Sequence, residues 1–110
     1  MQAIVQQLSP VECVQLAAYY AALPTSIERA QADPVPLGER LYRGGDLRKG
    51  IPACLACHGP AGLGNPSAGF PRLSGQYAAY VAAQLKAFRS GEHKDGWQMM
   101  TLLTQTMTDE

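Results

Sequence analysis

Three residues near the middle of the chain could do chemistry as one unit: Cys54, Cys57 and His58. Two thiols three residues apart lie on the same side of a helical turn, where both can add to the vinyl groups on one edge of a porphyrin. The histidine that follows directly can then present its imidazole to the iron from one face of the ring. Cys-x-x-Cys-His is the attachment signature of haem c. The sequence therefore predicts one covalently bound haem c, with His58 as an iron ligand.

Two other uses of paired cysteines are disfavoured by what surrounds this motif. A thioredoxin-like redox pair needs a βαβ context, and the sequence does not show one. A structural zinc site needs a second pair of ligands, and only Cys13 and His93 remain, far apart in the sequence. Cys13 lies in the first predicted helix, and we expect it to face the protein core as a small apolar residue, with an intermolecular disulfide as the alternative.

The second axial ligand of the iron must come from another part of the chain. The candidates are His93 and the four methionines, Met1, Met99, Met100 and Met107. A thioether opposite a histidine raises the reduction potential relative to two histidines, as in small electron-carrying cytochromes. Met99 and Met100 follow the longest predicted helix, in a segment that should fold back over the open face of the haem. His93 lies in a charged stretch and is expected to face solvent.

The elements that must position these residues are predicted to be helices throughout. Ser9, Pro10 and Glu12 form a capping pattern at the start of a helix that Pro24 ends. An extended loop rich in glycine and proline is expected over 59–75. Further helices are predicted over 37–43, 54–58, 76–90 and 98–106. No strand pattern of any length is present. The predicted class is all-α, a small helical domain wrapped around one haem c.

Composition and charge exclude several classes of function. The 110 residues fit one small domain. Nine basic and nine acidic residues cancel, and no basic stripe favours nucleic acid as a partner. No apolar run approaches the roughly 18 residues that a membrane span needs, and residues 1–8 show no secretory signal. Haem c is normally attached outside the cytoplasm. We therefore expect a periplasmic protein whose signal has been removed or lies outside this sequence.

The residues around the haem motif resemble a known family. Residues 52–62 read Pro-Ala-Cys-Leu-Ala-Cys-His-Gly-Pro-Ala-Gly and are followed by Gly64-Asn65, then by Phe-Pro-Arg-Leu-Ser-Gly-Gln over 70–76, and later by Met99-Met100. This combination resembles the cytochrome c4 family of class I cytochromes c, which are periplasmic two-haem electron carriers built from two similar domains. In that family the second methionine of the pair is the axial ligand, which here is Met100; Met99 and Met1 are the alternatives.

The resemblance also implies roles for residues around the haem. The loop that carries Pro71 lies beside the proximal histidine in that family, so the Pro71 carbonyl is the expected hydrogen-bond acceptor for His58. Arg72 and Gln76 are similar to family residues near the haem edge, and Trp97 is expected there as well. The resemblance thus implies a set of haem-binding residues that extends well beyond the attachment motif.

A short internal repeat indicates how the chain is organised. With an offset of 99 residues, Met1 falls on Met100 and the capping Ser9 falls on Thr108. In the family that the chain resembles, each domain has an axial methionine, a short helix and then a capped terminal helix. We therefore expect three parts: a segment over 1–23 that resembles the end of a preceding cytochrome domain, a linker over 24–36, and a haem domain over 37–110 that lacks its own last helix.

The helix over 10–23 is expected to pack against the haem domain, either of its own chain or of a partner. A single amphipathic helix is marginal in water, and the haem domain would otherwise expose an apolar groove. Packing against a partner would give a dimer or a helix-swapped oligomer.

The function that these features predict is electron transfer, without enzymatic activity. The haem, with His58 and Met100 as axial ligands, would shuttle electrons between periplasmic redox proteins, such as a reductase or a terminal oxidase. A six-coordinate iron has no open site for a substrate. The alternatives are a haem peroxidase or a gas-binding sensor with an open sixth position, and an electron-transfer subunit tethered to a dehydrogenase.

Overall fold

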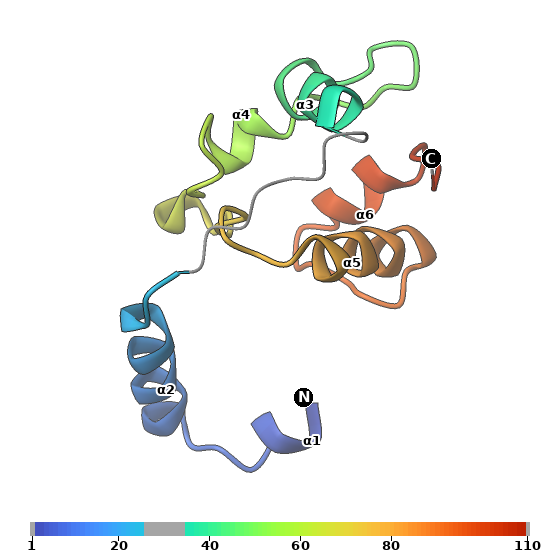
Figure 1. Ribbon diagram of the computed structural model, residues 1–110. Helices are drawn as coiled ribbons and strands as arrows, with labels where there is room; N and C mark the ends of the chain where they lie inside the picture. The colour runs from blue at the N-terminus through green and yellow to red at the C-terminus, as the bar shows by residue number, and fades with distance from the viewer. Residues whose placement is uncertain (1, 26–34, 110) are drawn as a thin grey trace.

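The computed structural model describes residues 2–25 and 35–109, without the side chain of Gln2. These residues form helices joined by loops (Figure 1), and they contain only isolated bridges, Asp46–Ile51 and Asn65–Phe70, in place of strands. The elements are α1 (Gln2–Val5), α2 (Pro10–Ala22), α3 (Val35–Gly44), α4 (Leu55–His58), a 3-10 helix (Pro66–Ala68), α5 (Ala78–Ser90) and α6 (Met99–Thr104). The prediction of an all-α class is confirmed.

Helix α2 begins as its capping pattern predicts. The Ser9 hydroxyl accepts the Glu12 N–H at 3.3 Å, and the Glu12 carboxylate accepts the Ser9 N–H at 2.8 Å. These reciprocal bonds satisfy backbone donors that the first turn of a helix otherwise leaves without partners. The helix ends at Ala22, two residues before Pro24, because proline offers no N–H to continue it.

The other predicted helices are present, with shifted ends. Helix α3 begins at Val35, two residues inside the predicted linker, because Pro36 is tolerated in the first turn of a helix. Residues 26–34 of that linker lie outside the described residues. Helix α5 begins at Ala78, two residues after the predicted start at 76. Helix α6 covers 99–104, which is shorter than the predicted 98–106. The predicted 59–75 loop includes one short 3-10 helix.

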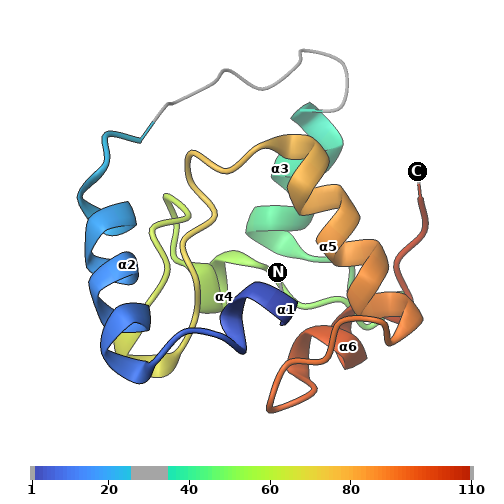
Figure 2. The same ribbon diagram turned by 90° about the horizontal axis from the view of Figure 1, so that it is seen from below.

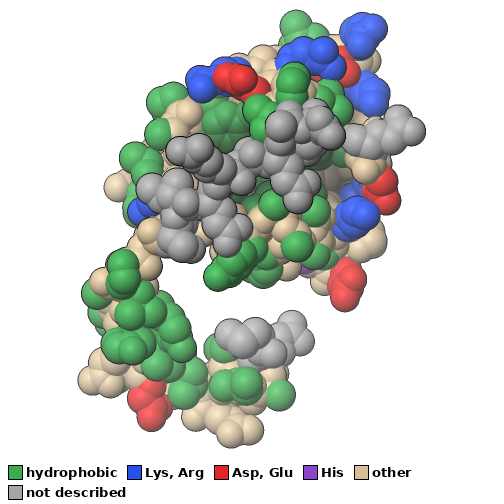
Figure 3. Space-filling view, in the orientation of Figure 1, with side chains coloured by type: hydrophobic (Ala, Val, Ile, Leu, Met, Phe, Trp, Pro, Cys, Tyr) green, Lys and Arg blue, Asp and Glu red, His purple; other side chains and the backbone are tan. Residues whose placement is uncertain are grey.

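The prediction that α2 packs against the rest of its own chain is wrong. No side chain of α2 is buried, and α1 and α2 stand apart from residues 35–109, which we call the body (Figures 1 and 3). The reason lies in the distribution of its large apolar residues. At 100° per residue, Val11, Val14, Tyr19 and Tyr20 are spread around the helix, and all four are exposed. No single apolar stripe selects a face for packing.

The body is held together by contacts of its loops and C-terminal segment more than by a core. Helices α5 and α6 pack against each other (Figure 2). The Arg89 guanidinium donates to the Met107 carbonyl at 2.9 Å and pairs with Asp109, which also lies 3.2 Å from the Lys86 ammonium. Ile51 is the only buried hydrophobic residue among those described. The polypeptide alone therefore provides little apolar burial for a domain of this size.

The loop after α4 folds back on itself, so that residues 62–64 lie beside residues 70–74. The Gly62 carbonyl accepts the N–H groups of Leu73 and Ser74 at 2.8 and 2.9 Å, and the Gly64 N–H donates to the His58 carbonyl at 2.9 Å. Gly64 has a φ of +75°, and a Cβ built there would lie 2.6 Å from the Phe70 carbonyl oxygen. A side chain at this position would clash with the backbone of residues 70–72 and push the two sides of the loop apart.

Replacement of Gly64 by alanine should therefore destabilise the haem-loaded protein by about 3 kcal/mol or more, because positive φ and a backbone clash act together. Gly50 is the matched control, since it has a φ of +70° but nothing within 4 Å of the added Cβ. Gly50→Ala should cost about 1 kcal/mol, from φ alone. Denaturant unfolding followed by circular dichroism measures both free energies. Equal losses in the two variants would contradict the close approach at Gly64.

Candidate functional site

The Cys-x-x-Cys-His motif forms a single helical turn. The His58 N–H donates to the Cys54 carbonyl at 3.0 Å, and α4 ends at His58. Gly59, which follows directly, has a φ of +79° that turns the chain away. The Cys54 and Cys57 side chains are half-buried, and neither forms a disulfide. His58 is buried, with 6% of its surface exposed. The turn thus places two thiols and one buried imidazole together, as the sequence predicts.

The His58 imidazole is held in one orientation by a backbone carbonyl. Its Nδ1 lies 2.8 Å from the Pro71 oxygen. Because a carbonyl only accepts, Nδ1 carries the proton, and the lone pair of the neutral ring is on Nε2. The Phe70 ring lies beside the imidazole, with 6.3 Å between ring centres. A histidine fixed in this way presents Nε2 as a metal ligand.

Tyr42 supports the motif from α3, and sequence reasoning did not identify this residue. Its hydroxyl donates to the Gly59 carbonyl at 2.6 Å, which ties α3 to the end of α4. Burial raises the pKa of Tyr42, so the phenol keeps the proton that it donates. The two residues are 17 positions apart, and no local pattern in the sequence connects them.

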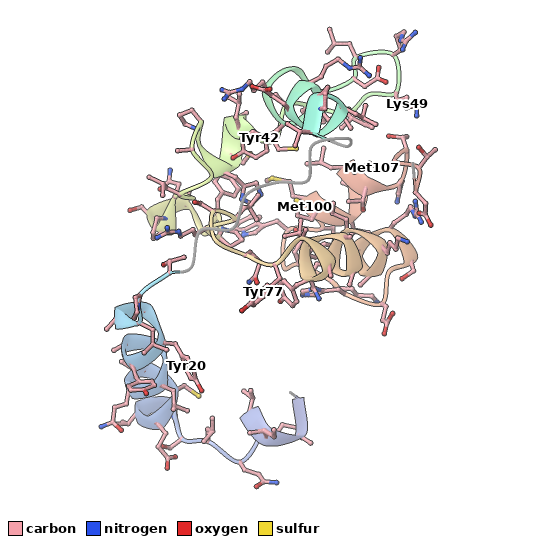
Figure 4. All side chains as sticks on the ribbon, in the orientation of Figure 1. Tyr20, Tyr42, Lys49, Tyr77, Met100 and Met107 are labelled. Carbon is pink, nitrogen blue, oxygen red and sulfur yellow. The ribbon has the colours of Figure 1, made fainter. Side chains whose placement is uncertain are left out.

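The candidates for the opposite ligand lie in different surroundings. Met100 is half-buried near the start of α6, and Figure 4 shows it on the inner side of that helix, whereas Met99 is 39% exposed. His93 is exposed and turned toward α5: its ring stacks on Phe88 at 4.3 Å, and its Nδ1 lies 2.6 Å from the Gln84 oxygen. Met1 lies outside the described residues. These positions favour Met100 over His93.

Three further predicted site residues lie on the surface. The Arg72 guanidinium donates to the Ser74 carbonyl at 2.9 Å, and the Gln76 side chain accepts the N–H of Tyr77 at 2.9 Å. Trp97 is 87% exposed. Each of the three is anchored locally or faces solvent, so their proposed places at a haem edge remain predictions.

The chemistry of the donor set does not fit a metal ion that is bound by side chains alone. The described residues contain no group of three or more His, Cys, Asp and Glu side chains that could hold one. Burial raises the pKa of the Cys54 thiol, which disfavours the thiolate that a zinc site or a redox disulfide would use. The set fits a porphyrin, because it offers two thiols on one side of a turn and a single oriented imidazole.

The apolar surface of the body also fits a large planar cofactor. Leu63, Tyr77, Tyr80 and Leu102 are each more than half exposed. Hydrophobic side chains cover much of the visible surface in Figure 3. A large apolar group bound beside α4 would bury surface of this kind, at about 25 cal/mol per Å².

No helix in residues 2–25 or 35–109 is long and apolar enough to cross a membrane. Cys13 of α2 is a free, half-buried cysteine. The prediction that it faces a core is wrong, because no residue of α2 is buried. The alternative, an intermolecular disulfide, stays a prediction.

Comparison with known proteins places this arrangement in a family. Residues 37–109 match the cytochrome c family. The chain is 45% identical over 91 residues to cytochrome c4 of Pseudomonas aeruginosa, covering 83% of this chain and 45% of that protein. It is 40% identical over 116 residues to a thiosulfate dehydrogenase electron acceptor of Thiomonas intermedia, covering 99% of this chain and 52% of that protein.

Solved structures agree with the sequence matches. The reduced recombinant cytochrome c4 of Pseudomonas stutzeri superimposes with a TM-score of 0.91 at 40% identity, over 96% of this chain and 57% of that one. The chain spans about half the length of the curated cytochromes c4 that it matches. The prediction of a class I cytochrome c fold is confirmed. The chain therefore belongs to the cytochrome c family, and its cofactor is covalently bound haem c.

Proposed function

We propose that this chain carries electrons between periplasmic redox proteins through one haem c, which is attached to Cys54 and Cys57 and has His58 and Met100 as axial ligands. The observation that carries the proposal is the hydrogen bond from the buried His58 imidazole to the Pro71 carbonyl at 2.8 Å. It fixes the tautomer and the direction of the ligand before the iron is bound.

The haem iron would gain and lose one electron, and the protein would bind the haem, orient it and tune its reduction potential. The Pro71 carbonyl makes the His58 imidazole more basic and holds it still. Burial of the His58 ring, which is 6% exposed, would keep water away from a bound iron on that side. A thioether from Met100 on the other side would raise the reduction potential relative to a second imidazole. With both axial positions filled by the protein, the site would exchange electrons without binding a substrate.

The names of several relatives support a class of partner. Two curated relatives are thiosulfate dehydrogenase electron acceptors, at 40% and 41% identity over nearly the whole of this chain. One solved structure with a TM-score of 0.82 is a thiosulfate dehydrogenase. We propose that the partner of this chain is a redox enzyme or carrier that passes electrons directly at a protein surface. Trp97 and Arg72 would lie near the haem edge that such a partner approaches.

Removal of Met100 tests the axial ligation. The oxidised haem-loaded protein should show the absorbance band of thioether-to-iron charge transfer, and Met100→Ala should abolish it, because alanine offers no ligand. Met99→Ala is the matched control and should keep the band. If Met100→Ala kept it and Met99→Ala lost it, the assignment of the ligand would be reversed. Loss only in a Met1 variant would assign the ligand to the first residue.

Carbon monoxide distinguishes an electron carrier from a peroxidase or a gas sensor. The reduced protein should bind carbon monoxide at least about a hundredfold more slowly than Met100→Ala at neutral pH, because the wild-type protein must first lose its thioether ligand. Stopped-flow absorbance measures both rates. Rapid binding by the wild-type protein, at the rate of the variant, would favour an open sixth position and would contradict the proposed function.

A further inference from the structure

The backbone of Met100 is attached on both sides to side chains of the protein. Its N–H donates to Oδ2 of Asp95 at 3.2 Å. Its carbonyl accepts the hydroxyl of Thr104 at 2.8 Å, and Thr104 is only 1% exposed. Thr104 is the last residue of α6, whereas Asp95 precedes the helix by four residues. The position of this methionine therefore depends on the two side chains that hold its peptide groups.

Asp95 supplies the cap that α6 would otherwise lack. The residue directly before the helix, Gln98, makes no side-chain cap hydrogen bond. Asp95 Oδ2 accepts the N–H of Met99 at 2.7 Å as well as that of Met100, and Oδ1 lies 3.4 Å from the Thr101 hydroxyl. The first N–H groups of a helix have no partner within the helix. One carboxylate thus satisfies two of them, where its negative charge is also favourable.

The backbone between Asp95 and α6 is under strain that this cap offsets. Gln98 has a φ of +53°, the only positive φ at a non-glycine residue in the described chain. Residues other than glycine rarely adopt this backbone conformation, which costs about 1 kcal/mol or more. Its N–H donates to the Asp95 carbonyl at 2.9 Å. A tight turn from Asp95 to Gln98 therefore brings the carboxylate under the start of the helix.

The capping residue is itself connected to α5. Two residues earlier, the His93 N–H donates to the Ala87 carbonyl at 3.0 Å, and the His93 ring stacks on Phe88. The backbone of residues 93–95 thus joins a segment that is bound to α5 at His93 to the carboxylate that accepts the Met100 N–H. Since α6 has only six residues, it is too short to hold its own position.

We propose that Asp95 is a positioning residue for the axial ligand: its carboxylate holds the start of α6 so that the Met100 thioether stays on the iron. This rests on the proposed function, in which Met100 is that ligand. The role of Asp95 is mechanical, through the N–H groups of two methionines, and needs no contact with the haem.

The test uses the haem-loaded chain, with exogenous imidazole as a probe that competes with the thioether for the iron. Asp95→Ala removes the cap, and we expect imidazole to bind about tenfold more tightly to the oxidised protein, since loss of a helix cap typically costs a factor of this size. The charge-transfer band should weaken in parallel. Asp95→Asn should stay within about threefold of the wild-type protein, because its amide oxygen accepts the same N–H groups.

Asp109→Ala is the matched control, because Asp109 is another carboxylate near α6 that pairs with Lys86 and Arg89. It should leave the affinity for imidazole unchanged. If Asp95→Ala does not yield folded holoprotein, Asp95→Glu replaces it: the charge stays, but the longer side chain moves the acceptor, and imidazole should bind at least about threefold more tightly.

The outcomes separate this inference from the proposed function. If the wild-type protein lacks the charge-transfer band, the ligation by methionine fails, and the role of Asp95 fails with it. If the wild-type protein has the band but Asp95→Ala and Asp95→Glu bind imidazole with wild-type affinity, only the role of Asp95 is overturned. An equal change in Asp109→Ala would also overturn it, because the effect would then come from the loss of any nearby negative charge.

Discussion

The hydrogen bond between the His58 imidazole and the Pro71 carbonyl is the contact on which the site depends. It joins the attachment turn to a loop 13 residues away, at 2.8 Å. The loop brings Pro71 to the imidazole because the Gly62 carbonyl accepts the N–H groups of residues 73 and 74. Gly64 also lets the two sides of the loop approach closely. Fixing the proton on Nδ1 leaves Nε2 as the ligand atom. The glycines of this loop therefore allow the tight turn and also place the carbonyl that orients the histidine.

The small core has a physical explanation in the size of the cofactor. With one buried hydrophobic residue among those described, the polypeptide provides little apolar burial against the entropy of ordering its loops. A covalently bound haem supplies apolar surface that the polypeptide does not have, and it cannot dissociate from the folded state. Several polar contacts join segments of the described chain: the Tyr42 bond to Gly59, the Arg89 bond to Met107 and the cap of α6. They fix the geometry of the loops around the cofactor.

Helix α2 shows where a local signal stops being informative. The capping box at Ser9 and Glu12 and the stop before Pro24 are predictable, because they involve groups within a few residues of one another. The expected packing of this helix on its own chain was wrong. Its large apolar side chains point in several directions, so the sequence contains no preference for one neighbour. The repeat is consistent with the structure in one respect: α1 (Gln2–Val5) aligns with 101–104, within α6, at the offset of 99.

The sequence by itself determined the all-α class, the cofactor and its attachment motif, because each depends on residue types at short, fixed spacing. It also singled out Met100 and the Pro71 carbonyl, through the resemblance of several separated motifs to one family. Tertiary structure decided the rest. Whether Tyr42 reaches Gly59, whether His93 turns toward α5 and which carboxylate caps α6 depend on how loops close in space. Those contacts join residues whose separation along the chain leaves no periodic signal, and only the folded backbone brings them within hydrogen-bond distance.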